Sequence, residues 1–173
     1  AAFGPVNSAR SANVLRSALL AGIFAFLGAV LQGGSVANRV GSGLLQGEIV
    51  TVQAAAILLV GATLVLASVY FDYPMPTAFT VVGAVVGAGL GFGNPVQWSS
   101  LGEVVGYWLI IPPLAAILGY TIAKILRHTV SKQENEKVMR YLLVIAGSYV
   151  AYTAGANSVG LAVGPLGAVI SSI

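Results

Sequence analysis

The chain has 173 residues, of which 57% are hydrophobic and 8% are charged. Soluble domains carry about 25% charged residues, and 8 basic plus 5 acidic side chains cannot cover a water-facing surface. A soluble globular domain is therefore excluded, and lipid must cover much of the exterior. Cysteine is absent, which excludes a disulfide framework, a thiolate metal site and a cysteine nucleophile. The net charge of +3 is interpreted as loop charge of a membrane protein, and no nucleic-acid partner is expected.

Five apolar segments predict helices. In chain order they are 15–34, 49–70, 77–93, 104–126 and 141–154. A membrane helix needs about 20 apolar residues, and segment 77–93 is shorter and rich in glycine. The fifth segment meets the polar insert 155–158 and resumes at Val159, which predicts a broken helix. The expected fold is an all-α membrane protein, a polytopic helical bundle with about five transmembrane segments.

The basic residues predict the orientation. Five of the eight lie within or just before 127–140, namely Lys124, Arg127, Lys132, Lys137 and Arg140. Basic loops face the cytoplasm, so this loop is expected inside. Counting back through four spans places Arg10 and Arg16 on the same side and Arg39 on the other, provided that 77–93 crosses.

The expected organisation has three parts. Residues 1–126 hold the helices of a first repeat, 127–140 form the charged cytoplasmic loop, and 141–173 begin a second repeat with its broken helix. Residues 1–5 (Ala-Ala-Phe-Gly-Pro) match 161–165 (Leu-Ala-Val-Gly-Pro) at three positions. The chain leaves the two copies in opposite senses, as an inverted repeat requires. Ala1 opens the chain and 159–173 end within an apolar run, so sequence is expected beyond both ends.

Three features are candidates for function. Gly83, Gly87 and Gly91 share one helix face, and Gly87 is expected to pack on a neighbouring backbone. Pro74 and Pro76 prevent regular helix before Thr77, which is expected to cap a helix N-terminus that suits an anion. The insert 155–158 is expected to line a cavity, because unsatisfied backbone at membrane depth is tolerated only there or inside protein.

Several stretches resemble the inorganic phosphate transporter (PiT) family. Residues 152–165 (YTAGANSVGLAVGP) are similar to the family's second signature, G-A-N-D-V-A-N-A-x-G-P. Residues 26–33 (FLGAVLQG) resemble the helix that follows the first signature, and 73–91 resemble L-P-V-S-T-T-H-A-I-V-G-A-x-x-G. Residues 98–113 fit the W-S…W-x-x-S-P pattern. Only the charged loop is unmatched.

The resemblance implies a cell-membrane symporter with two inverted halves. It would bind phosphate at the midplane with a coupling cation, Na⁺ or H⁺, and no other cofactor or metal. The implied substrate-binding residues are Thr77, Thr80, Gly155, Ala156, Asn157 and Ser158. The residues implied to shape the site are Gly4, Pro5, Pro76, Gly164 and Pro165.

The chain also departs from the family pattern. The signature Asp corresponds to Ser158 and the second Asn to Leu161. In the proline segment Pro76, Ala78 and Phe79 stand where the family has Ser, Thr and His. The lost acid removes a candidate cation ligand, which leaves the coupling ion open, and sulfate or another oxyanion remains an alternative substrate.

Cation-coupled symport of phosphate or a related oxyanion is the expected function. The alternatives are a passive anion channel and a transport-inactive membrane scaffold or regulator. An enzyme is not expected, because the sole histidine, His128, lies in the charged loop and no carboxylate pair or metal-spaced cluster occurs. The expected partners are the anion and the lipid bilayer, and homo-oligomerisation is left open.

Overall fold

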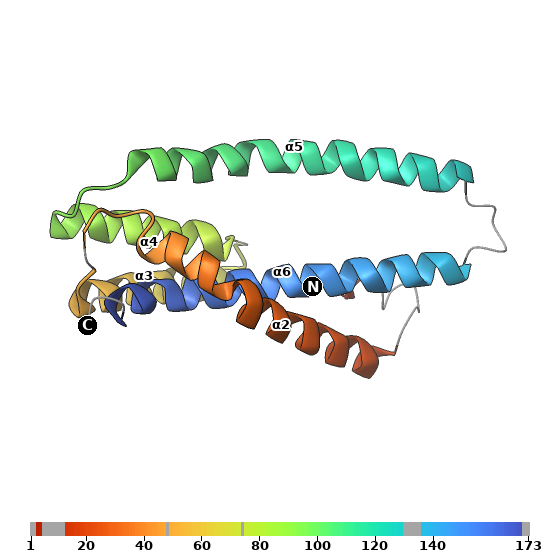
Figure 1. Cartoon of the computed structure of the whole chain (residues 1–173), viewed down its shortest axis with the longest axis horizontal. Helices are drawn as coiled ribbons and strands as arrows, with labels where there is room; N and C mark the ends of the chain where they lie inside the picture. Colours follow the sequence, from red (N-terminus) through yellow and green to blue (C-terminus); the bar gives the residue numbers. More distant parts are fainter. Residues whose placement is uncertain (1–2, 5–12, 48, 74, 130–135, 171–173) are drawn as a thin grey trace. The chain divides into compact units, whose positions relative to one another are not determined.

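The computed structural model describes residues 3–4, 13–47, 49–73, 75–129 and 136–170. These residues form five helices and no strand beyond one isolated bridge. The helices are α2 (Val14–Gly41), α3 (Thr51–Tyr70), α4 (Thr77–Phe92), α5 (Trp98–Thr129) and α6 (Glu136–Ile170), shown in Figure 1. The prediction of an all-α membrane protein is confirmed.

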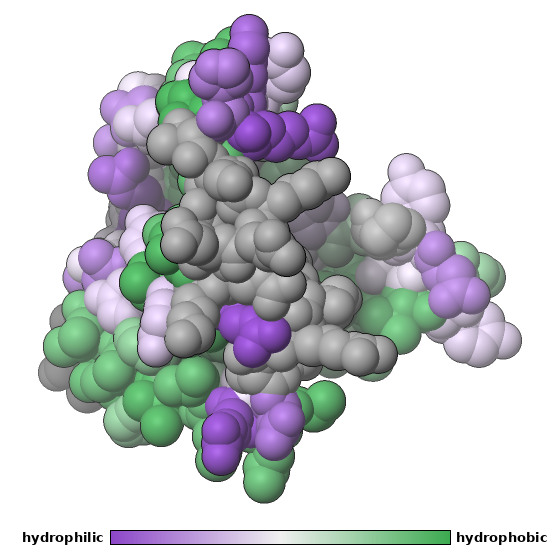
Figure 2. Space-filling model, turned by 90° about the vertical axis from the view of Figure 1, so that its right-hand side faces the viewer, coloured by the Kyte–Doolittle hydropathy of each residue, from purple (hydrophilic) through white to green (hydrophobic). Residues whose placement is uncertain are grey.

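Four of the helices are long and apolar enough to cross a membrane: α2, α3, α5 and α6. Helix α4 has 16 residues, or about 24 Å at about 1.5 Å per residue, which is less than the roughly 30 Å hydrocarbon core. Large apolar side chains cover the exterior; Phe26, Leu66 and Leu109 are each about 70% exposed. Apolar residues are prominent on the face shown in Figure 2. Such a surface is stable in a lipid bilayer, as in a multi-pass membrane protein.

The chain forms two units. One holds residues 1–23 and 99–151, with the start of α2, nearly all of α5 and the first part of α6. The other holds residues 24–98 and 152–173, with the rest of α2, helices α3 and α4, and the end of α6. Most of the buried apolar residues lie in the second unit, including Leu44, Leu45, Ile57 and Val85.

In the second unit, α2 and α6 pack through glycines. A Cβ placed on Gly28 would overlap the Tyr152 carbonyl, and one on Gly155 would overlap the Ala25 carbonyl. Without side chains at these positions the two backbones can approach closely, as in glycine-mediated packing of membrane helices. We call the contact of Gly28, Gly33, Gly41, Gly155, Gly160 and Gly164 the α2–α6 seam.

The seam is parallel and extends over several turns. A Cβ on Gly33 would lie 3.6 Å from the Val159 side chain, and one on Gly164 would lie 3.0 Å from the Ala37 carbonyl oxygen. Further along, Gly41 meets Gly164 and Ala168. The contacts follow the same order in both helices, so these two segments run in the same direction.

Helices α3 and α4 form an antiparallel hairpin, because a short turn joins them and they pack together. A Cβ on Gly61 would lie 3.8 Å from the Val81 side chain. At the open end of the hairpin, two segments run side by side. Leu45 and Val96 form an antiparallel bridge, flanked by backbone hydrogen bonds from Gln46 N to Pro95 O (2.8 Å) and from Gln97 N to Leu44 O (2.9 Å).

Two expectations about this hairpin are wrong. Thr77 does not cap α4, because the helix begins at Thr77 with Pro76 as the N-cap residue, and no side chain bonds to the cap. Gly87 does not pack on a neighbouring backbone within the described chain, since a Cβ on Gly83, Gly87 or Gly91 would meet nothing within 4 Å. These glycines instead line an open groove of about 490 Å³ between α3 and α4.

Helix α6 is continuous, so the prediction of a broken helix is also wrong. Residues 155–158 are helical throughout. Glycine costs about 1 kcal/mol in a helix and Asn or Ser less, whereas an unpaired backbone group in lipid costs several kcal/mol. Of the residues expected in the charged loop, 127–129 belong to α5 and 136–140 to α6, and 130–135 lie outside the described residues.

Candidate functional site

The first part of the predicted site is the start of α4. The N–H groups of Thr77 and Ala78 precede the first intrahelical donors, which are Phe79 N and Thr80 N bonding to the Pro76 carbonyl at 3.0 and 3.4 Å. No side chain caps this end, and the Thr77 side chain is exposed. The helix therefore presents free donors and the positive end of its dipole, which favour an anion.

Thr80 lies in the first turn of α4, and its expected contact with the substrate stays a prediction. Its side chain is 3% exposed, and its Oγ1 donates a hydrogen bond of 2.8 Å to the Thr77 carbonyl oxygen. The hydroxyl proton is thus used inside the first turn of α4. In this structure Thr80 stabilises the turn that positions Thr77.

The second part is the signature-like stretch on α6, where the side chains divide into two groups. Gly155, Ala156 and Gly164 face α2 along the seam, and Ala156 is 4% exposed. Asn157 and Ser158 are exposed, and the described residues give their side chains no hydrogen-bond partner. Because the backbone of residues 155–158 is helical, only the side chains of Asn157 and Ser158 are available to a ligand within this insert.

The residues predicted to shape the site lie in different environments. Pro165 is almost fully buried within α6. Gly4 is exposed, and a Cβ placed on it would meet nothing within 4 Å. Pro5 lies outside the described residues. The binding of the anion by Thr77, Asn157 and Ser158 together stays a prediction.

Sequence reasoning did not single out Gln53, a buried polar residue. Gln53 lies in the first turn of α3 and is 1% exposed, and its Nε2 has no hydrogen-bond partner among the described residues. A glutamine at the start of an otherwise apolar helix was the available signal. The described residues also contain no group of three His, Asp or Glu side chains that could hold a metal ion.

The family follows from a match over most of the chain. The model of the phosphate transporter family matches residues 1–137. The chain belongs to the phosphate transporter family. The match includes α2 to α5 and ends before the signature-like stretch of α6, so the role of Asn157 and Ser158 is still inferred from the residues themselves.

The relatives of this chain are named for two different substrates, sulfate and phosphate. A sulfate permease of Bacillus subtilis is 31% identical over 86% of this chain and 43% of its own length. A candidate phosphate permease of Chlamydia pneumoniae is 32% identical over 73% of this chain and 32% of its own. A chloroplastic inorganic phosphate transporter of Arabidopsis thaliana is 30% identical over 78% and 24%. The chain thus spans less than half the length of these relatives, and no solved structure matches it.

Proposed function

We propose that the transporter containing this chain carries inorganic phosphate, or a related tetrahedral oxyanion, across the membrane by cation-coupled symport. Membership of the phosphate transporter family carries this proposal. The apolar exterior and the four membrane-length helices agree with it. One relative is named a sulfate permease and another a phosphate transporter. The proposal therefore names the class of anion, a tetrahedral oxyanion, and not one substrate.

The proposed anion pocket combines the α4 N-terminus with the exposed amide and hydroxyl on α6. Every described Lys and Arg lies at a helix end or close to one, so no basic side chain supplies charge at mid-span. The uncapped donors at Thr77 and Ala78 supply the positive end of a helix dipole. Asn157 and Ser158 supply neutral donors that fix the orientation of the anion.

The coupling cation requires acceptor oxygens. Pro165 has no N–H, so the Leu161 carbonyl loses the donor that a helix normally places four residues later. This carbonyl lies one turn beyond Asn157 and belongs to the class of backbone oxygens that coordinate cations in transporters. Ser158 offers only a hydroxyl where the family signature has an acid, so we expect weaker dependence on the cation.

Asn157→Ala tests the pocket. Removing a donor to a charged group costs about 1.5–3 kcal/mol, so the apparent affinity for the anion should fall roughly ten- to a hundredfold. The measurement is uptake of labelled phosphate and labelled sulfate by the full-length protein in vesicles, with and without a Na⁺ gradient. Asn38→Ala makes the same chemical change at an exposed position of α2 that is not among the proposed pocket residues, and it should leave uptake unchanged.

The same uptake assay distinguishes the symporter from a second candidate function, a transport-inactive membrane scaffold. The signature acid is replaced by Ser158 and the histidine of the proline segment by Phe79, and these losses favour a transport-inactive scaffold. Absence of uptake of both anions by correctly folded parent protein would support the scaffold and reject the symporter. Unchanged affinity in Asn157→Ala would remove that residue from the pocket.

A further inference from the structure

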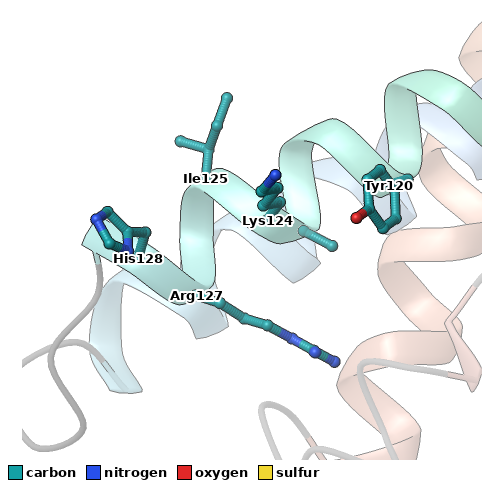
Figure 3. A pocket seen from close by; sticks show the side chains of 6 residues that line it. Tyr120, Lys124, Ile125, Arg127 and His128 are labelled. Atoms are coloured by element: carbon teal, nitrogen blue, oxygen red, sulfur yellow. The ribbon is translucent and has the colours of Figure 1, made fainter.

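The end of α5 carries a group of polar side chains that the transport proposal does not use. Tyr120, Lys124, Arg127 and His128 line an open cavity of about 680 Å³, together with Ala123 and Ile125. All six belong to the last three turns of one helix, and Figure 3 shows them from close by. We call this group the α5 basic cluster.

The spacing of the α5 basic cluster concentrates its donors. Residues three and four apart lie next to each other on a helix face, which relates Tyr120 to Lys124 and Lys124 to Arg127 and His128. In Figure 3, Arg127 extends to one side of α5 and Ile125 to the other. The four polar side chains are exposed, and among the described residues Lys124, Arg127 and His128 form no ion pair. The cavity therefore holds an excess of donors.

An apolar surface continues from the cluster along α5. Leu114, Ile117 and Leu118 are exposed by 50–64%, and no part of the most apolar stretch of α5 is buried. Figure 2 looks onto the side of the structure where α5 ends, and it shows both hydrophilic and apolar residues there. A ligand with a charged head and long apolar tails fits both surfaces at once.

We propose that the α5 basic cluster binds the phosphate headgroup of an anionic phospholipid, whose acyl chains lie along α5. The Arg127 guanidinium can bind two phosphate oxygens together, and the Lys124 ammonium adds a second charge. Basic side chains where a span leaves the bilayer attract anionic lipids. Tyr120 places its hydroxyl at the same level, as interfacial aromatic residues do. A free oxyanion would use the donors and leave the apolar surface unused, so the lipid is favoured.

The test measures binding of phosphatidylglycerol to the full-length protein held in phosphatidylcholine, by native mass spectrometry across a lipid titration. Each basic residue near the surface contributes about 1 kcal/mol. The double variant Lys124→Gln, Arg127→Gln should therefore bind phosphatidylglycerol roughly thirtyfold more weakly than the parent. The charge-conserving variant Lys124→Arg, Arg127→Lys should bind within a few-fold of the parent, which separates lost charge from lost folding.

A second double variant is the matched control. Arg16→Gln with Arg140→Gln removes two positive charges at exposed positions outside the cavity lining and should keep binding within a few-fold of the parent. An equal loss in both double variants would mean general attraction to charge and would overturn the site. Displacement of the lipid by excess inorganic phosphate would identify a free-anion site and overturn the lipid assignment. Parent-like binding by Lys124→Gln, Arg127→Gln would overturn the proposal outright.

Discussion

At the scale of single residues, Gln53 has an unusual position. It lies among the buried residues of α3 with 1% of its surface exposed, next to Ala54 and one turn before Ile57. Its Nε2 has no partner among the described residues. A buried donor without a partner costs about 1–3 kcal/mol, and this cost falls on the α3–α4 hairpin that presents Thr77.

Replacement of Gln53 by methionine should therefore stabilise the protein. Gln53→Met keeps the length of the side chain and removes the unpaired donor, so we expect a gain of about 1 kcal/mol. Thermal unfolding of the full-length protein in detergent measures it. Gln32→Met, at an exposed position of α2, should change little. A loss of stability in Gln53→Met would mean that a group outside the described residues accepts the Nε2 hydrogen bond.

At the scale of elements, the α2–α6 seam explains why glycines recur in the signature-like stretch. Gly155, Gly160 and Gly164 are the positions where α6 meets the backbone or Cβ atoms of α2. The seam fixes the rotation of α6 about its axis, because only its glycine face can approach α2 closely. Asn157 and Ser158 are thereby left exposed, where a ligand can reach them.

The seam predicts a contrast between two glycines of the same helix. A Cβ on Gly155 would overlap the Ala25 carbonyl, whereas one on Gly167 would meet nothing within 4 Å. Gly155→Ala should destabilise the protein by about 1–3 kcal/mol, as overpacking does. Gly167→Ala should be neutral or stabilising by up to about 1 kcal/mol, because alanine favours helix. Thermal unfolding of both variants checks this, and equal stability of the two would mean that the helices do not pack at Gly155.

The positions of the helices could be predicted from the sequence, whereas the contacts between them could not. Apolar runs located all five helices, since membrane-length apolar segments have few alternatives. Their ends were missed where polar residues continue the helix, as Asn38 and Arg39 do in α2. The break at 155–158 was expected because Gly, Asn and Ser are weak helix formers, and the demand for paired backbone groups outweighed that preference. The partner of Gly28 was not predictable, since glycine spacing identifies a packing face and not the helix that it meets.

At the scale of the whole molecule, the bridge between Leu45 and Val96 constrains the membrane topology. It holds the segment before α3 beside the segment after α4, so both segments lie on one side of the membrane. This holds whether α3 and α4 both cross or enter and return as a re-entrant pair. The short length of α4 therefore does not change the side of the membrane assigned to these two segments. The assignment from basic residues had assumed that 77–93 crosses the membrane.

The last prediction follows from this constraint. If α5 crosses once, the residues between α5 and α6 lie opposite the segment that contains Leu45. Single cysteines at Ser131 and Gln46 test it, because the chain has no cysteine of its own; cysteines elsewhere in the full-length protein would first be replaced. In intact cells an impermeant thiol reagent should label Gln46→Cys, which is exposed, and should label Ser131→Cys only after the membrane is permeabilised. Labelling of both from outside would mean that α5 does not cross. Labelling of Ser131→Cys alone would reverse the orientation and place the α5 basic cluster at the outer leaflet, where phosphatidylglycerol must then be supplied for binding.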